Sequence, residues 1–416
     1  QSLTDLEGPH LDDDTWVIFT SGSTGVPKGV AVSHRSAAAF VDAEAKLFLQ
    51  HDPIGPGDRV LAGLSVAFDA SCEEMWLAWR YGAGLVPAPR SLVRSGEDLG
   101  PWLLRHQISV VSTVPTLAAL WPSETIEQVR LLIFGGEACP LELTQRLVGE
   151  GREVWNTYGP TEATVVACAA LLDGSAPIRI GLPLDGWELA VVDADGRRVT
   201  EGESGELIIG GVGLARYLDP AKDAEKYAPM ESLGWDRAYR SGDLVKFEEA
   251  GLVFLGRADD QVKIGGRRIE LGEVEAALQA VTGVTGSAVA VRKTSADVSI
   301  LVGYIVTGAG YERQLARAEL GEQLPKALIP LLAEVDSLPT RTSGKVDKNA
   351  LPWPLPGADD VSGDLDGHVA WLAEQWQAVL GLPVGSEDAD FFDLGGGSLS
   401  AAQLVTRVRA RVPEFT

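Results

Sequence analysis

The sequence has few cysteines and no long apolar run. Cys72, Cys139 and Cys168 are far apart and form no CxxC pair, so neither a disulfide framework nor a zinc site is expected. We predict that all three are buried apolar residues. No apolar stretch approaches the roughly 18 residues that span a bilayer, and the acidic first residues do not resemble a signal peptide. A cytoplasmic location is therefore expected, and the sequence leaves open whether a longer parent protein is attached to a membrane.

Positive charge is scarce as well. The chain has 35 Lys and Arg residues against 59 Asp and Glu residues, which gives a formal net charge of -24. General nucleic-acid binding is excluded, because a polyphosphate backbone requires a basic surface. With 416 residues, of which 45% are hydrophobic, the chain is long enough for more than one domain with its own core.

The hydrophobic pattern predicts a large α/β region over residues 1–258. Strand-like runs at 109–114, 130–134 and 207–210 alternate with helical stretches, and we expect tight turns at Gly205 and at Asp195-Gly196. A smaller α+β region is predicted over 259–352. Its helices are expected at 271–281 and 311–324, and its strands at 287–291 and 299–306.

The last part of the chain is predicted to be helical. Prolines at alternate positions after Leu351 predict a semi-rigid linker, which we place at 353–366. Beyond it, residues 367–416 contain an amphipathic helix at 369–380 and a second helix that begins at Ser398.

A glycine-rich and hydroxyl-rich segment at 20–29, TSGSTGVPKG, suits phosphate binding. Backbone N–H groups of such a loop can approach phosphate oxygens, and Lys28 supplies charge. It is not a Walker A loop, because Gly29 follows the lysine where that motif has Ser or Thr. The preceding run at 16–19, WVIF, predicts a buried strand that would place the loop at the usual ligand edge of an α/β sheet. Alone, such a loop is more often an ordinary turn.

Five further motifs follow in order, and together they carry a family resemblance. They are NTYGPTE at 156–162, YRSGDL at 239–244, GRADDQVKI at 256–264, RTSGKVDK at 341–348 and DFFDLGGGSL at 390–399. From about residue 14 onward the chain resembles the adenylation domains of nonribosomal peptide synthetases, followed by a peptidyl carrier domain. The resemblance implies an adenylate-forming fold with a large α/β subdomain, a small α+β subdomain and a helical carrier domain.

The same resemblance suggests that the sequence is a fragment. Two family motifs that normally precede the loop at 20–29 are absent, and Gln1 is not an initiator residue. The carrier domain also ends soon after Phe415, so we expect the large subdomain and the carrier domain both to be truncated.

The resemblance implies the roles of the nucleotide-binding residues. Tyr158 would stack on adenine near Asn156, Asp243 would accept both ribose hydroxyls, and Arg257 would assist there. The residues expected at the β- and γ-phosphates are Thr20, Ser21, Ser23, Thr24 and Lys28.

The catalytic roles follow from the same motifs. Thr161 and Glu162 would face the α-phosphate and Mg²⁺, for which a carboxylate is a suitable hard ligand. Lys345 would bridge the substrate carboxylate and the phosphate in the transition state, where developing negative charge strengthens the contact. Asp259 would be the hinge of the small subdomain. Gly265 stands where the family commonly has arginine, which puts any contact of that arginine in doubt.

The amino-acid pocket is expected to select a basic side chain. Asp69 matches the family aspartate that pairs with an α-ammonium group, and Glu73 is the one charged residue among the other pocket positions. Those positions are Ala70, Glu73, Ser112, Ile133, Gly135, Thr157, Val165 and Val166. Because a lone buried carboxylate requires a cation or a proton, we predict L-lysine or a related diamino acid such as ornithine. The pocket is similar to those of the poly-lysine synthetase group. In the alternative, Glu73 and Glu74 both face solvent on a helix.

The predicted function is therefore activation of an amino acid as its adenylate and its transfer to a carrier thiol. The expected cofactors are ATP, Mg²⁺ and 4'-phosphopantetheine on Ser398. The expected partners are a phosphopantetheinyl transferase and downstream condensation or peptide-forming domains. Two alternatives stay open: a stand-alone acyl- or aryl-CoA ligase, which would lack Asp69 and Ser398, and an inactive carrier and docking fragment.

Overall fold

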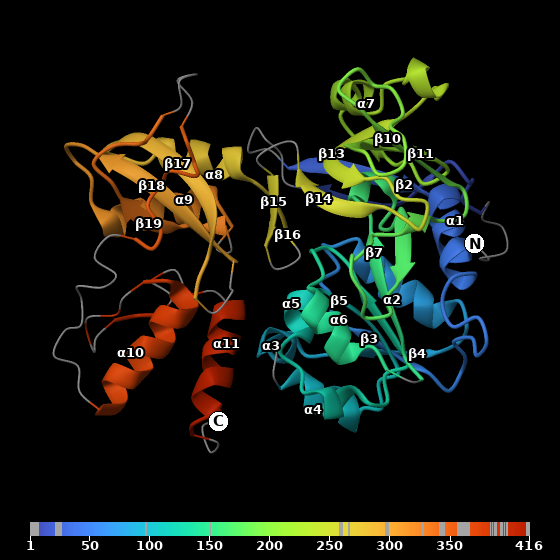
Figure 1. Ribbon diagram of the computed structural model, residues 1–416, viewed down its shortest axis with the longest axis horizontal. Coiled ribbons are helices and arrows are strands. Elements are labelled where there is room, and N and C mark those ends of the chain that lie inside the picture. Colours follow the sequence, from blue (N-terminus) through green and yellow to red (C-terminus); the bar gives the residue numbers. More distant parts are fainter. Residues whose placement is uncertain are drawn as a thin grey trace, which may run out of the picture. The chain divides into compact units, whose positions relative to one another are not determined.

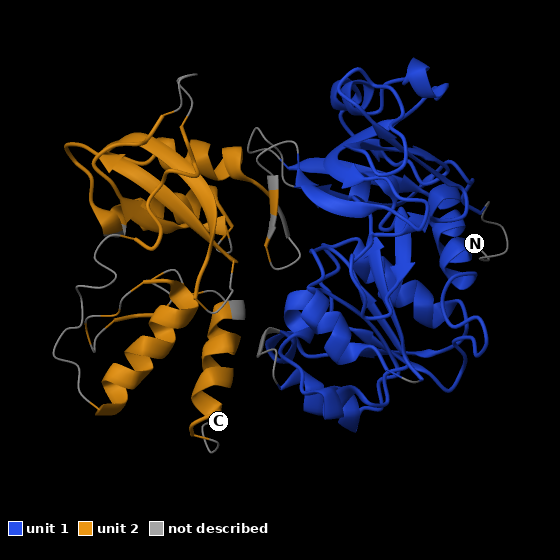
Figure 2. Cartoon of the chain, viewed as in Figure 1, with its two compact units in different colours: residues 1–21, 27–93, 98–259 blue, residues 22–26, 94–97, 260–416 orange. Residues whose placement is uncertain are grey.

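The computed structural model divides the chain into two compact units (Figure 2). Unit 1 comprises residues 1–21, 27–93 and 98–259, and unit 2 comprises residues 22–26, 94–97 and 260–416. The structure describes residues 8–20, 27–95, 98–149, 151–257, 261–264, 267–295, 299–325, 328–340, 346–355, 367–382, 384, 386, 389–391, 394, 396 and 398–412.

A seven-stranded sheet forms the centre of unit 1 (Figure 1), in the order β4-β3-β5-β6-β7-β8-β9. The first five strands in this order are parallel, and β8 and β9 continue the sheet antiparallel. The strands are β3 (Arg59–Ala62), β4 (Gly84–Pro87), β5 (Val110–Thr113), β6 (Leu131–Phe134), β7 (Glu153–Tyr158), β8 (Cys168–Leu171) and β9 (Leu182–Pro183).

Helices cover both faces of this sheet, and β6 shows why. All four of its residues are buried, as expected for a parallel strand between two helical layers. Ile133 belongs to a hydrophobic cluster with Phe40 of α1, whereas Phe134 belongs to another with Leu103 of α4. The helices of unit 1 are α1 (His34–Ala45), α2 (Ala70–Trp79), α3 (Arg90–Ser95), α4 (Leu99–Arg105), α5 (Pro115–Ala118), α6 (Leu141–Leu147) and α7 (Pro220–Lys226).

Two antiparallel sheets complete unit 1, in the orders β1-β2-β12 and β10-β11-β13-β14. Their strands are β1 (Asp14–Thr20), β2 (Lys28–Ser33), β10 (Trp187–Val192), β11 (Ser204–Gly211), β12 (Arg216–Tyr217), β13 (Tyr239–Lys246) and β14 (Val253–Arg257). A turn with Gly196 at φ 78° lies where the Asp195-Gly196 pair predicted it. The prediction for Gly205 is wrong, because it lies within β11, where a Cβ would approach the Val192 carbonyl oxygen to 2.1 Å.

The first strand lies where the sequence predicted it, but it is neither fully buried nor part of the parallel sheet. β1 pairs with β2, with Thr20 opposite Lys28, so the two strands form an antiparallel hairpin outside the seven-stranded sheet. The side chain of Ile18 is buried, but Val17 is 37% and Phe19 64% exposed. The glycine-rich segment therefore joins two hairpin strands and does not follow a buried parallel strand.

Unit 2 contains an α+β region as predicted. A sheet in the order β17-β18-β19 packs with α8 and α9, and a separate hairpin is formed by β15 and β16. These elements are β15 (Gln261–Ile264), β16 (Arg267–Glu270), α8 (Leu271–Gln279), β17 (Val284–Lys293), β18 (Ser299–Thr307), α9 (Arg313–Gln323) and β19 (Leu331–Glu334). Leu351 and Leu355 are buried against this sheet, and Trp353 Nε1 donates to the Lys293 carbonyl oxygen at 2.8 Å. The rest of the predicted linker, 356–366, lies outside the described residues.

Two helices, α10 (Gly367–Leu380) and α11 (Ser398–Arg409), pack against each other at the end of unit 2 (Figure 1). Both were predicted from the sequence. Their shared core contains Val379, Leu380 and Phe391, and the ring of Trp376 meets Phe391 edge to face. Among the described residues, no helix has the length and apolar character that crossing a membrane requires.

The backbone at Gly181 lies very close to strand β8 of the seven-stranded sheet, and a substitution there tests this close approach. A Cβ there would lie 1.8 Å from the Ala169 carbonyl oxygen, and φ is +91°. We expect Gly181→Ala to lower the midpoint of urea unfolding, followed by tryptophan fluorescence, by far more than Gly202→Ala. Gly202 has a similar φ of +86° but open space around it, so it measures the cost of the backbone conformation alone. Equal midpoints in the two variants would contradict the close approach.

Candidate functional site

Three predicted nucleotide-binding residues meet in one buried cluster. Asp243 lies on β13, Arg257 at the end of β14 and Tyr158 at the end of β7. Arg257 Nη1 contacts Asp243 Oδ1 at 2.8 Å, and the Tyr158 hydroxyl donates to Asp243 Oδ2. Burial and the neighbouring carboxylate raise the pKa of Tyr158 well above its usual value. Each carboxylate oxygen keeps a second lone pair, so Asp243 can still accept hydroxyl donors from a sugar.

The two residues before Tyr158 on β7 are also fixed by hydrogen bonds. Asn156 Nδ2 donates to the Arg179 carbonyl oxygen at 2.7 Å, and Thr157 Oγ1 donates to the Phe134 carbonyl oxygen at 3.0 Å. Both side chains are buried at the carboxyl end of the parallel part of the sheet. Ligands of open α/β sheets commonly bind at this edge, so the sequence motif lies where a ligand site is expected.

Glu162 is held by two tyrosines that the sequence motifs did not indicate. It is 1% exposed, its Oε1 accepts from the Tyr217 hydroxyl at 2.7 Å, and its carbonyl oxygen accepts from the Tyr227 hydroxyl at 2.9 Å. Burial and the charge of Glu162 raise the pKa of both tyrosines. A carboxylate oxygen kept in place by a neutral donor fits a Mg²⁺ ligand. Among the described residues, no group of three or more His, Cys, Asp or Glu side chains could hold a metal ion by itself.

Asp69 lies beside this carboxylate. It is the residue before α2, and its side chain accepts from the Ala70 backbone N–H at 3.0 Å. Desolvation raises the pKa of Asp69, a hydrogen bond from Thr161 lowers it, and the charge of Glu162 raises it. The structure thus brings together the predicted residues for an α-ammonium group and for the metal.

Glu73 is buried, which excludes the alternative that it faces solvent. Its side chain is 2% exposed, and Ser112 Oγ of β5 donates to its Oε2. Desolvation is the main reason for its raised pKa. A second buried carboxyl group, Glu44 near the end of α1, forms a side-chain hydrogen bond with Glu73 and has a pKa raised well above the usual value by burial and by Glu73.

Glu44 was missed in the motif analysis. It lies on the face of α1 that also carries Ala37 and Phe40. Phe40 follows Ala37 by three residues, and Glu44 follows Phe40 by four. An acidic residue in that apolar stripe was the available signal, because Glu is rarely buried without a partner.

Glu74 is also buried, but it has a different environment. Its Oε1 accepts from the Gly63 backbone N–H at 2.9 Å, and its Oε2 accepts from the Leu64 N–H at 3.1 Å. Burial raises the pKa of Glu74 to about 8 despite these donors. Glu74 therefore fixes the backbone after β3, and Glu73 alone of this adjacent pair contacts Ser112.

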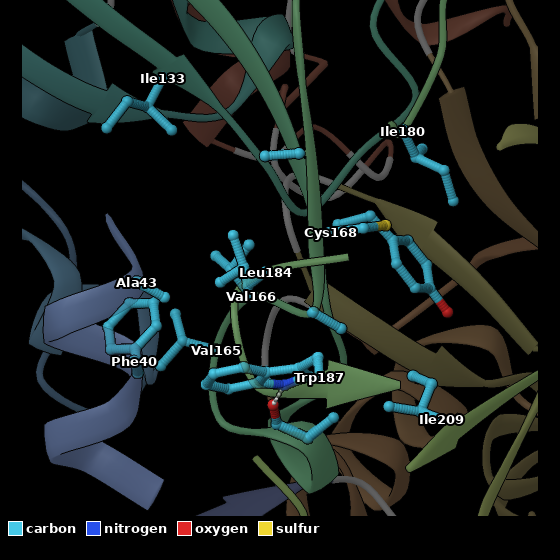
Figure 3. Packing of buried hydrophobic residues seen from close by; sticks show 14 of the residues in the cluster. Phe40, Ala43, Ile133, Val165, Val166, Cys168, Ile180, Leu184, Trp187 and Ile209 are labelled. Carbon is cyan, nitrogen blue, oxygen red and sulfur yellow. Dashed lines mark hydrogen bonds between the residues drawn. The ribbon is translucent and has the colours of Figure 1, made fainter. Parts of the chain in front are cut away.

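The remaining predicted pocket residues are small or apolar. Figure 3 shows Ile133, Val165 and Val166 in the same hydrophobic cluster as Phe40 and Ala43 of α1. The other predicted members are Ala70, at the first turn of α2, and Gly135, where a Cβ would lie 2.9 Å from Thr157 Oγ1.

The backbone after Tyr158 is strained. Thr164 and Val165 have φ of 61° and 65°, a region that β-branched residues rarely adopt. Thr164 Oγ1 donates to the Gly213 carbonyl oxygen at 2.7 Å, and a Cβ at Gly159 would approach the Val165 carbonyl oxygen to 2.3 Å. Close packing of this loop on itself keeps Val165 in its unusual conformation.

Several predicted residues have no described side chain. Ser21, Ser23, Thr24, Asp259 and Lys345 lie outside the described residues, and Gly265 does as well. Thr20 and Lys28 are described at the ends of the hairpin strands. The hydroxyl oxygen of Thr20 is buried and has no hydrogen-bond partner among the described residues, as expected for a group that meets a ligand.

The predicted attachment serine begins a helix. Ser398 is the first residue of α11, an end of a helix that favours negative charge; nothing is described of its side chain. The preceding segment packs closely, because a Cβ at Gly396 would lie 2.3 Å from the Phe391 ring. Gly396 therefore has a packing role.

All three cysteines are free and buried, as predicted. Burial raises the pKa of Cys72 to about 11 and that of Cys139 to about 12. The pKa of Cys168 is also raised by burial.

Two family models match the sequence. Residues 3–218 match the AMP-binding enzymes, and residues 370–413 match the phosphopantetheine attachment site. The chain is 42% identical over 408 residues to the phosphinothricin tripeptide synthetase PhsC of Streptomyces viridochromogenes, which covers 94% of this chain and 37% of that protein. It is 38% identical over 416 residues to the delta-poly-L-ornithine synthetase of Acinetobacter baumannii. This match covers 96% of this chain and 31% of that protein. The chain thus spans about a third of the length of these relatives.

Solved structures show the same fold. A holo NRPS protein with adenylation and PCP domains, bound to a vinylsulfonamide inhibitor, has a TM-score of 0.79 and 28% identity, covering 96% of this chain and 68% of that chain. The Vibrio cholerae adenylation domain AlmE, in complex with glycyl-adenosine-5'-phosphate, has a TM-score of 0.73 and 26% identity. This match covers 83% of this chain and 66% of that chain.

The raised pKa of Glu74 predicts a pH dependence of stability. A carboxyl whose pKa is higher in the folded than in the unfolded chain binds more protons when folded, so it stabilises at low pH. That contribution is lost as pH rises from about 4.5 to about 8. We expect Glu74→Gln, which keeps an oxygen acceptor, to gain stability relative to the native chain across this range. Urea unfolding midpoints at a series of pH values measure it, and a constant difference would refute the burial of an ionisable group there.

Proposed function

Because this chain belongs to the AMP-binding enzymes and carries a phosphopantetheine attachment site, we propose that it activates an amino acid with ATP and loads it onto its own carrier domain. The predicted adenylate-forming α/β fold is confirmed by the solved adenylation and carrier structures. ATP, Mg²⁺ and 4'-phosphopantetheine are the cofactors of this chemistry. The family match to the attachment site also argues against a stand-alone acyl-CoA ligase. Because the reaction consumes ATP, we expect it to occur in the cytoplasm.

The reaction has two steps. A carboxylate oxygen of the amino acid attacks the α-phosphorus of ATP, and the bond to pyrophosphate breaks. Ser398 would carry the phosphopantetheine, whose thiol would take the aminoacyl group from the adenylate as a thioester, with AMP as the leaving group and the thiol proton released. Two anions must be brought together in the first step, so positioning and electrostatic stabilisation are the main tasks of the protein.

The described residues divide these tasks between two clusters. Asp243, with Arg257, would hold the ribose, and Tyr158 would stack on adenine near Asn156. Thr20 and Lys28, which flank the predicted phosphate loop in the sequence, would bind the phosphates. Their support is the buried network around Asp243 and the Thr20 hydroxyl oxygen, which has no partner within the described part of the chain.

The acyl side of the reaction would depend on the neighbouring carboxylates. Glu162 would hold Mg²⁺, which offsets phosphate charge when bound. Thr161 would lie next to the reacting phosphate, and Asp69 would orient the substrate through its α-ammonium group. Lys345 keeps its proposed transition-state role, and Asp259 its proposed role as the hinge.

We propose L-lysine or a related diamino acid as the substrate, and one observation carries this: Glu73 is buried, and its Oε1 has no hydrogen-bond partner among the described residues. A substrate ammonium group would supply the missing donor and compensate the charge. Asp69 and Glu73 are four residues apart at the start of α2, so they lie on one side of the helix about 6 Å apart along its axis. A relative that bears the name of a poly-ornithine synthetase is consistent with a diamino acid.

The parent protein would use the loaded amino acid in peptide synthesis. The relatives named as synthetases are about three times as long as this chain or longer, so further domains would act on the loaded carrier. We expect a phosphopantetheinyl transferase as one partner and downstream condensation or other peptide-forming domains as others. An inactive carrier and docking fragment is the competing function.

Amino-acid-dependent exchange of pyrophosphate into ATP tests the first step. Glu73→Gln should lower kcat/KM for L-lysine about tenfold or more relative to that for L-norleucine, because a hydrogen bond to a charged group is lost. Norleucine has the same carbon chain without the charge and is the matched control substrate. Equal losses on both substrates would refute selection by Glu73, and no exchange with any amino acid would refute activation by this chain.

Ser398→Ala tests the second step. This variant should retain exchange but gain no mass on incubation with coenzyme A and a phosphopantetheinyl transferase, because the hydroxyl that accepts the group is gone. Ser400→Ala, on the same helix, is the matched control and should still be modified. Modification of the Ser398→Ala variant, read by intact-mass spectrometry, would place the attachment site elsewhere.

A further inference from the structure

The proposed amino-acid pocket contains a second buried carboxyl group, that of Glu44. It is 3% exposed and lies in the last turn of α1, while Glu73 lies in the first turn of α2. The two helices are in contact, and the two side chains are close enough to share a hydrogen bond when one is protonated. No sequence motif includes Glu44.

Each of these carboxyl groups has an oxygen without a donor. Glu44 Oε1 and Glu73 Oε1 are both buried and have no hydrogen-bond partner among the described residues. Buried polar atoms in proteins are nearly always paired, so two such oxygens on adjacent acidic groups require an explanation. In the part of the chain that the structure describes, no basic group contributes to the pKa of either residue.

A cation with several N–H donors would supply the missing partner. Two carboxyl groups in contact hold one proton between them, so the pair carries a single negative charge when the pocket is empty. An ammonium group has three donors. It would satisfy both Oε1 atoms, and Ser112 Oγ, which already donates to Glu73, keeps lone pairs for the third.

We propose that Glu44 is a second specificity-determining residue, which binds the side-chain cation of the substrate together with Glu73. This inference rests on the proposed activation of an amino acid and deepens it. Glu73 alone would leave Glu44 as a buried group without a function, whereas the pair forms one acceptor site made by α1 and α2.

Substitution of Glu44 tests the proposal. Glu44→Leu removes both the donor to Glu73 and the acceptor for the ligand, so Glu73 is left alone and takes up a proton. The ratio of kcat/KM for L-lysine to that for L-norleucine, measured by exchange with the full chain, should fall about tenfold or more. Glu74→Gln is the matched control, because Glu74 is an equally buried glutamate whose oxygens bind backbone N–H groups. At pH values well below 8, where Glu74 is protonated, its ratio should stay at the native value.

The pH dependence of the same ratio is a second test, and it does not require Glu44→Leu to fold. The pKa of Glu44 is raised in the empty pocket, and a bound cation lowers it, so binding of lysine releases a proton. The lysine to norleucine ratio should therefore rise as pH increases above the usual carboxyl range. Glu44→Gln keeps a donor to Glu73 but cannot ionise, so its ratio should depend less on pH than that of the native chain.

The Glu44→Gln variant separates Glu44 from the other titratable groups near the pocket. Asp69 acts on the charge of Glu73, and Glu73 acts on that of Glu74. Ionisation of Asp69 or Glu74 would attract the side-chain cation of lysine but not norleucine, so these groups also contribute to the pH dependence of the ratio. Glu44→Gln keeps both groups, so the part of the pH dependence that this variant loses belongs to Glu44.

The outcomes separate this inference from the proposed function. An unchanged ratio in Glu44→Leu, or a Glu44→Gln variant with the native pH dependence, overturns the role of Glu44 and leaves amino-acid activation intact. A native preference for an apolar amino acid also overturns it. Absence of exchange with every amino acid removes the proposed function itself. A selective loss for lysine in Glu44→Leu with a normal Glu74→Gln control supports the pair.

Discussion

Burial of negative charge at the carboxyl end of the parallel strands is the constraint on which the rest of the site depends. Asp69, Glu73 and Glu162 all lose water when unit 1 folds, and a desolvated carboxylate is costly without a partner. The structure supplies neutral donors for part of each group: Thr161 for Asp69, Ser112 for Glu73 and Tyr217 for Glu162. Neutral donors fix the position of a carboxylate but leave its charge uncompensated. Under the proposed function, cations that arrive with the substrates would compensate this charge.

Rigid surroundings are necessary for such an arrangement. The two helices that carry Glu44 and Glu73 pack on the parallel sheet, whose strands are buried on both faces. The loop after Tyr158 holds Val165 in a left-handed conformation that only dense packing can maintain. Dense packing of this kind fixes the pocket wall beside the acidic groups.

Much of this could be predicted from the sequence, and the failures have specific physical reasons. Motif order led to the Asp243 cluster, because its members lie in segments with a distinctive local pattern. The run at 16–19 was predicted to be buried because four apolar residues in succession are typical of a parallel strand, yet β1 pairs in a hairpin that exposes Phe19. Pairing partners come from distant segments, and composition alone does not reveal them.

Glu44 shows a second limit. Asp42 and Glu44 are two residues apart on α1, but Asp42 faces outward and pairs with Arg80, whereas Glu44 faces the core. Helical periodicity predicts which of the two is buried only when the helix start is known to within a residue. Tyr217 and Tyr227 reach Glu162 from beyond β11 along the chain, and no pattern near the Glu162 motif indicates them.

The three buried thiols have a consequence for the fate of the activated acyl group. An aminoacyl-adenylate reacts with any accessible thiolate, and thiolates form readily only when the pKa is near ambient pH. Cys72, Cys139 and Cys168 are all shielded, and burial raises the pKa of each. The chain therefore presents no nucleophilic sulfur of its own to intercept the mixed anhydride. Self-acylation on cysteine is suppressed, and the prosthetic arm would have no intramolecular competitor.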